Sequence, residues 1–251
     1  VSTLSAMEFR RYNAISSIDR DEWNNLARLS VTPLLSWEWL EHLESSGSIS
    51  ERTGWKPSHL AVYERGSMIA AVPLYLHDDS WGEFVFDFAF AELAGELQSP
   101  YYPKLVGMSP FSPIPAFQFL TVPDRERELT PLIIEHLTSY CRSESIPVLQ
   151  FNFVLPDWKE RLVRTGMVAW EHHGFEWYND GFNSFDDYLA QFNKNQRRNI
   201  RRERRSVRES GIRVSVFSAT DASEHIFDRM AEYYRNTNAQ FGPFAARFLT
   251  D

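Results

Sequence analysis

Acid–base side chains are concentrated between His77 and Ala116. Glu83 and Asp87 are four residues apart in the segment WGEFVFDFAF, where aromatic residues surround both. Four residues make about one turn of a helix and an even step along a strand, so either element would place the two carboxylates on one side. Burial among aromatic rings raises carboxyl pKa values, as a general base requires. The alternative is that the two acids cap a helix or pair with Lys104.

A second group of reactive side chains follows in the segment SPYYPKL. Tyr101, Tyr102 and Lys104 stand there with prolines that stiffen the chain. A phenol protonates a leaving group or orients an acceptor, and an ammonium group holds a carboxylate or a phosphate. Packing alone is the alternative for either tyrosine. The candidate catalytic residues are therefore Glu83, Asp87 and Tyr101, and the candidate substrate-binding residues of this stretch are Trp81, Tyr102 and Lys104.

Asn152 is a further candidate for substrate binding. It is a polar residue inside the apolar run IPVLQFNFV, so it must find partners or line a cavity. Gln150 shares its strand face. The Pro-rich and aromatic stretch 77–116 is interpreted as the wall of a pocket. Within it, His77 stands beside two aspartates and is either a base or a solvated turn residue.

The segment Lys194–Arg208 is strongly basic in an acidic chain. It holds eight of the 26 Lys and Arg residues of a protein with a formal net charge of −8. At helical spacing the arginines line two adjacent faces, and their planar guanidinium groups bind phosphate or carboxylate at two points. A solvated helix whose arginines pair with acids is the alternative. The acidic remainder of the chain disfavours DNA as a partner.

Composition narrows the class of protein further. The 251 residues suffice for one large or two modest domains, and the single cysteine, Cys141, excludes an intrachain disulfide. No apolar run has the roughly 20 residues of a membrane span, and the first residues lack the pattern of a signal peptide. We therefore expect a cytoplasmic protein without a membrane span. The histidine spacing indicates no metal site, and the oligomeric state is open.

Hydrophobic periodicity and turn residues predict a mixed α/β fold. The predicted order is β-α-α-β-β-β-α-β-α-β, with a hairpin over 59–76, a helix over 125–143 and strands at 146–154 and 175–179. The order then restarts with a helix from 184 into the arginine segment, a strand at 213–217, a helix over 221–236 and the opening of another at 241–251. We predict a first domain over 1–173 and the beginning of a second over 174–251.

This repeated order resembles the acyl-CoA N-acyltransferase (GNAT) fold in tandem, with an incomplete second unit. More specifically, the chain resembles a predicted N-acyltransferase family related to the FemAB-type peptidoglycan aminoacyltransferases. The segments that carry the resemblance are Pro33–Leu60, Trp81–Ala91, Tyr101–Pro113, Phe175–Arg204 and Tyr233–Gly242.

The resemblance implies transfer of an acyl or aminoacyl group to an amine, including that of a peptidoglycan precursor. It implies a small-molecule or cell-wall-precursor substrate, acyl-CoA as donor with aminoacyl-tRNA as the alternative, and phosphate contacts for Arg198 and Arg201. A noncatalytic module that recognises an anionic or peptidoglycan-derived ligand is the other function considered. One departure concerns the donor: PDRERELTPL, after the strand at 117–122, lacks the glycines of the family's pyrophosphate loop. The second unit's loop is expected to lie beyond Asp251.

Overall fold

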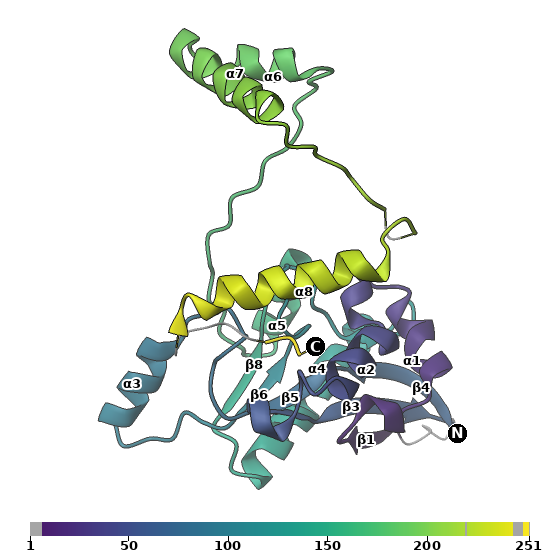
Figure 1. Cartoon of the computed structure of the whole chain (residues 1–251). Helices are drawn as coiled ribbons and strands as arrows, with labels where there is room; N and C mark the ends of the chain where they lie inside the picture. Colours follow the sequence, from purple (N-terminus) through teal and green to yellow (C-terminus); the bar gives the residue numbers. More distant parts are fainter. Residues whose placement is uncertain (1–6, 219, 243–247, 251) are drawn as a thin grey trace. The chain divides into compact units, whose positions relative to one another are not determined.

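The computed structural model describes residues 7–218, 220–242 and 248–250. They form two units, one made of the chain up to 169 together with the stretch from 235, and the other made of 170–234 (Figure 1). Each is described by itself below. The assignment of domains to 1–173 and 174–251 stays a prediction.

The first unit contains two four-stranded sheets. One is antiparallel, in the order β1-β3-β4-β7, with β1 (Glu8–Tyr12), β3 (His59–Glu64), β4 (Ser67–Val72) and β7 (Leu120–Thr121). The other has the order β2-β5-β6-β8, with β2 (Trp55–Pro57), β5 (Leu74–His77), β6 (Lys104–Gly107) and β8 (Val148–Phe151). Strands β6 and β8 are parallel, and the other pairs of this sheet are antiparallel. The mixed α/β class is therefore confirmed.

Local sequence signals account for most elements of the first unit. The β3–β4 hairpin turns at Arg65 and Gly66, whose φ angles are 53° and 82°, a left-handed geometry that glycine adopts without strain. The helices here are α1 (Arg20–Ala27), α2 (Trp37–Ser45), α3 (Phe88–Glu96), α4 (Glu126–Ser143) and α5 (Pro156–Arg164), and the short 3-10 turns are η1 (Ile15–Ser17), η2 (Pro33–Leu35) and η3 (Glu51–Thr53). The Asp19 side chain caps helix α1 and that of Ser36 caps helix α2.

The main core lies where the antiparallel sheet meets the helices. Trp23, Leu40, Leu60, Phe119 and Trp158 are all at most 1% exposed and belong to one buried cluster. A smaller cluster around Trp55, Tyr75 and Val106 lies on the mixed sheet. Burial of such large apolar side chains is the main stabilising contribution to a unit of this size.

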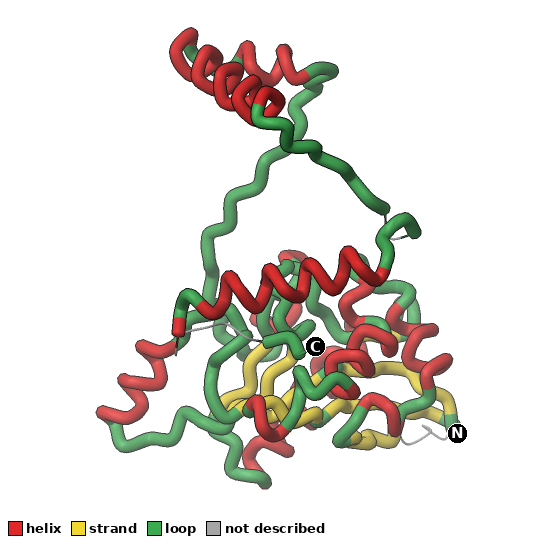
Figure 2. Tube along the Cα trace, in the orientation of Figure 1, coloured by secondary structure: helices red, strands yellow, loops and turns green. Residues whose placement is uncertain are grey.

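The second unit consists of helices and irregular chain in the described residues, as the absence of yellow strands in it shows (Figure 2). It contains α6 (Phe185–Ala190), α7 (Lys194–Glu209) and the beginning of α8 (Glu224–Ala239). The predicted strands at 175–179 and 213–217 are wrong. Phe175, Val214 and Val216 are more than 80% exposed there, and no described strand lies beside them to complete a ladder of hydrogen bonds.

The arginine segment forms a helix, as predicted, but that helix is not continuous with the one before it. Asn193 interrupts them, because its side chain accepts hydrogen bonds from the backbone N–H groups of Asn195 and Gln196 and so begins α7. The predicted helix at 241–251 lies largely outside the described residues. A tandem repeat of the first fold is not shown.

Candidate active site

The neighbouring strands β5 and β6 position His77 and Lys104 next to each other. In the register of the mixed sheet, His77 at the end of β5 lies directly opposite Lys104 at the start of β6. Residues 78–87 then leave β5 and pass over this end of the sheet as an irregular loop, where Phe84 and Phe86 have φ angles of 59° and 54°. Glu83 and Asp87 therefore lie on neither a helix nor a strand, contrary to both predicted geometries. Helix α3 begins only after Asp87.

The loop closes around the Lys104 ammonium group. Lys104 Nζ donates to Ser80 Oγ, Glu83 Oε2 and Asp87 Oδ2, each at 2.8 Å. Lys104 and Glu83 are fully buried and Asp87 is 1% exposed. A buried charge needs partners of this kind, and here every donor of the ammonium group is used. The pairing of both acids with Lys104, the alternative raised by the sequence, is what the structure contains.

Further polar side chains complete the network. Tyr101 Oη donates to Asp87 Oδ2 at 2.8 Å, and Tyr102 Oη lies 2.9 Å from Ser80 Oγ. The Asn152 amide donates to Glu83 Oε2 at 3.3 Å. The structure thus brings together six of the predicted site residues, namely Glu83, Asp87, Tyr101, Tyr102, Lys104 and Asn152. Their roles in catalysis and substrate binding stay predictions.

His77 is a member of the network whose burial the sequence does not reveal. Its Nδ1 donates to Glu83 Oε1 at 2.6 Å, and its ring stacks on Trp55 at a centroid distance of 4.0 Å. His77 Nε2 lies 3.1 Å from Asp79 Oδ1, at ion-pair distance, without a hydrogen bond to the described residues. The ring is fully buried, so the interpretation as a solvated turn histidine is wrong. Only the pairing of β5 with β2 and β6 shows this, because it places His77 between Trp55 and Lys104.

Burial and neighbouring charges shift the pKa values of His77 and Asp87 in opposite directions. Burial lowers the pKa of His77, but the carboxylates of Asp79 and Glu83 outweigh it and raise that pKa above its ordinary 6.5. Burial likewise raises the pKa of Asp87, yet hydrogen bonds from Lys104 and Ser80 leave that pKa lowered overall. The predicted rise in pKa is therefore wrong for Asp87, because the Lys104 ammonium group is buried beside it. Burial and the neighbouring Asp87 raise the pKa of Tyr101, which keeps its phenol protonated.

These shifts predict that the stability of the fold depends on pH through His77. A histidine whose pKa is raised on folding stabilises the native state fully below about pH 6.5 and loses that contribution as pH rises through the folded pKa. The groups facing it are Asp79, Glu83 and, beyond them, Lys104. Urea unfolding from about pH 5 to pH 9 should show the wild type losing stability relative to His77→Gln as pH rises. His42→Gln, at an exposed site, is the control. A wild-type curve parallel to that of His77→Gln would contradict the assignment.

A pocket of about 460 Å³ opens beside this network in the first unit. Asp79 and Trp81, both about half exposed, line it together with Trp55 and Phe111. Asp79 Oδ1 accepts from the Trp81 backbone N–H at 2.7 Å, while Oδ2 has no hydrogen-bond partner among the described residues. Asp79 is thus the carboxylate of the network that lines this pocket. A carboxylate beside aromatic faces binds a cationic group, since both attract positive charge.

The predicted phosphate-binding arginines belong to the second unit. Arg201 Nη2 forms an ion pair of 2.9 Å with Asp186 Oδ1, and both side chains are exposed. Arg198 is also exposed and forms no ion pair within the described part of the chain. The pair of Arg201 agrees with the interpretation of α7 as a solvated helix. Phosphate contacts of Arg198 and Arg201 stay a prediction.

Two kinds of feature are absent from the described residues. None of their helices combines the length and the apolar character that crossing a membrane requires. No three His, Cys, Asp or Glu side chains among them are grouped so as to hold a metal ion.

Comparison with known proteins places the chain in a family. Residues 14–251 match the FemAB-like family, which is described by peptidoglycan biosynthesis and recognition, and the chain belongs to it. No curated protein matches the sequence.

Several solved acetyltransferase structures are similar to this chain at low sequence identity. One is the ribosomal-protein-alanine N-acetyltransferase from Brucella melitensis biovar Abortus 2308, with 13% identity, 69% of this chain and 100% of that chain covered, and a TM-score of 0.41. Another is the glucosamine-6-phosphate N-acetyltransferase from Arabidopsis thaliana, with 13% identity, 69% and 99% covered, and a TM-score of 0.39.

Proposed function

We propose that this protein is an N-acyltransferase that moves an acyl or aminoacyl group onto an amine, with the acceptor bound at Asp79 and Trp81. The observation that carries the proposal is the Asp79 carboxylate, which is held at a pocket wall with one oxygen free for a ligand. An acceptor amine is an ammonium ion at neutral pH before it reacts, and this site suits that cation. Family membership supports an amine of a peptidoglycan precursor as the acceptor.

The buried network positions the acceptor site without touching the acceptor. Protonated His77 ties Asp79 to Glu83, and Lys104 fixes Glu83 in turn. Burial raises the pKa of Asp79, but His77 and the Trp81 backbone N–H outweigh it and lower that pKa overall, so Asp79 stays ionised and binds the ammonium form. The bound ammonium ion then loses its proton to water, since the other carboxylates of the network are enclosed. The free amine forms the new bond to the acyl carbon, and the donor leaves as the thiol of coenzyme A or the terminal hydroxyl of tRNA.

The donor is proposed to be acyl-CoA, with aminoacyl-tRNA as the alternative. The backbone N–H groups at the N-terminus of α4, which follows β7, do not form a diphosphate site. The carboxylates of Glu126 and Glu128 lie beside them and repel an anion from the helix end, and the Arg125 guanidinium is already bound to Glu64 and Glu128. The donor diphosphate is therefore not placed at this helix end. The GNAT-like fold and its tandem arrangement belong to the same proposal.

A noncatalytic recognition module is the second candidate, and one observation favours it. Glu83, Asp87 and Lys104 satisfy one another in a fully enclosed cluster, so Asp79 is the only one of the network's carboxylates at the pocket. A pocket that binds a cationic, peptidoglycan-derived ligand needs no more than this.

Turnover separates the two functions. The protein is mixed with acetyl-CoA and a panel of primary amines, and release of free thiol is followed; a parallel assay supplies aminoacyl-tRNA. We expect amine-dependent release with one of the two donors. If the protein binds an amine but transfers no group from either donor, the proposed enzymatic function is wrong and the recognition function remains.

A further inference from the structure

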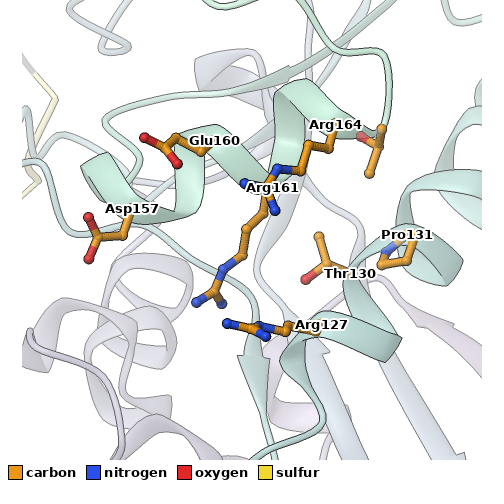
Figure 3. Close-up of a pocket in the computed structure, with 8 residues that line it drawn as sticks. Arg127, Thr130, Pro131, Asp157, Glu160, Arg161 and Arg164 are labelled. Carbon is orange, nitrogen blue, oxygen red and sulfur yellow. The ribbon is translucent and has the colours of Figure 1, made fainter.

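A second cavity of about 590 Å³ lies between α4 and α5, and its lining differs in charge from the acceptor pocket. Figure 3 shows residues of both helices facing it. The volume falls in the range of sites that hold small molecules. None of its lining residues belongs to the network around Lys104.

Three arginines line this cavity. Arg127 comes from α4, and Arg161 and Arg164 come from α5. Arg161 is paired with Glu126, whereas Arg127 and Arg164 form no ion pair with any described residue. In Figure 3 the guanidinium ends of Arg127 and Arg161 point toward one another. Two facing cations repel, and an anion between them is gripped by both, most effectively a phosphate that matches the guanidinium fork.

An unpaired buried hydroxyl also lines the cavity. Thr130 is 1% exposed, and its Oγ1 has no hydrogen-bond partner within the described chain. Figure 3 shows this oxygen directed to the side where the two guanidinium groups lie. A buried hydroxyl without a partner is costly, so such a group marks a place where a ligand completes the bonding. Next to it, Pro131 has no N–H to donate, which leaves the Arg127 carbonyl without its helical partner.

We propose that this cavity is a binding site for a small phosphorylated molecule that carries hydroxyl groups, such as a sugar phosphate. The phosphate lies between Arg127 and Arg161, and Thr130 donates to it. Asp157 and Glu160, also on the lining, accept hydrogen bonds from the ligand hydroxyls. This site is separate from the acceptor pocket and does not depend on acyl transfer.

Calorimetric titration with glucose 6-phosphate tests the site, with inorganic phosphate and glucose as the other probes. Glucose 6-phosphate should bind more tightly than phosphate, and glucose should not bind. Arg127→Gln should weaken the binding of glucose 6-phosphate about tenfold or more, because it removes a charged donor that forms no ion pair with the described residues. Arg142→Gln, in the last turn of the same helix, is the matched control and should bind like the wild type.

Thr130→Val separates a binding role from a structural one. It removes the unpaired hydroxyl but keeps the shape, so the ligand-free protein should unfold at the same or a higher temperature while glucose 6-phosphate binds more weakly. The proposal is overturned if neither phosphate compound binds, or if Arg127→Gln and Thr130→Val bind glucose 6-phosphate as tightly as the wild type. Equal affinity for phosphate and glucose 6-phosphate would overturn the hydroxyl contacts.

Discussion

Replacing Lys104 with methionine should destabilise the first unit by about 3–5 kcal/mol, the cost of leaving a buried ion cluster without one partner. The substitution keeps a long side chain but leaves Glu83 and Asp87 enclosed without their shared cation. Two carboxylates confined together cannot both remain ionised at low cost. Urea unfolding followed by the fluorescence of the buried tryptophans measures the change.

Lys56→Met is the matched control for this substitution. Lys56 forms an ion pair with Asp78 at 2.9 Å, but both side chains are more than a third exposed. Exposed pairs contribute about 0–1 kcal/mol, so this variant should unfold almost like the wild type. Equal losses in Lys104→Met and Lys56→Met would contradict the account of the buried network. Adding Glu83→Gln and Asp87→Asn to Lys104→Met should restore part of the stability, because the unpaired charges are then gone.

Replacing Asp79 with asparagine should lower kcat/KM for the acceptor amine by about 10- to 100-fold, the value of a charged hydrogen bond. The amide keeps the size of the side chain and its contact with the Trp81 backbone, but it no longer attracts an ammonium ion. The loss should appear in the KM for the amine more than in that for the donor. Steady-state assays with the amine varied at saturating donor separate the two constants.

Asp78→Asn provides the control for that prediction. Asp78 is the neighbouring carboxylate, it is about half exposed, and it pairs with Lys56 and not with His77. Replacing it should leave kcat/KM within a factor of about two of the wild-type value, since surface ion pairs contribute little. Thermal unfolding of both variants shows whether either has lost its fold. Equal activity of Asp79→Asn and the wild type would exclude Asp79 from acceptor binding.

Local signals in the sequence predicted the elements that depend on few residues. The hairpin over 59–76 and the helical form of the arginine segment both follow from signals between residues close together in the chain. The strand predicted at 213–217 does not form. That prediction is wrong because a strand needs a neighbour, and no described strand pairs with it.

The membership of the candidate site was predictable in part, since Asp79 was not among the predicted residues, and its geometry was not predictable. The sequence predicts two groups, Glu83 with Asp87 and Tyr101 with Lys104. It joins them only through the alternative in which the two acids pair with Lys104. The loop that carries the two acids was not predictable, because Phe84 and Phe86 adopt a left-handed backbone that their residue type does not indicate. The burial of His77, and hence the exposed position of Asp79, depends on strand register across distant segments.

The most direct test of the acceptor site is calorimetric binding of a primary amine, such as Nα-acetyl-lysine amide, to the wild type, Asp79→Asn and Asp78→Asn at neutral pH. Binding to the wild type and to Asp78→Asn that falls at least about tenfold in Asp79→Asn is the result we predict. Identical affinity in all three proteins would contradict the assignment of this pocket to the amine.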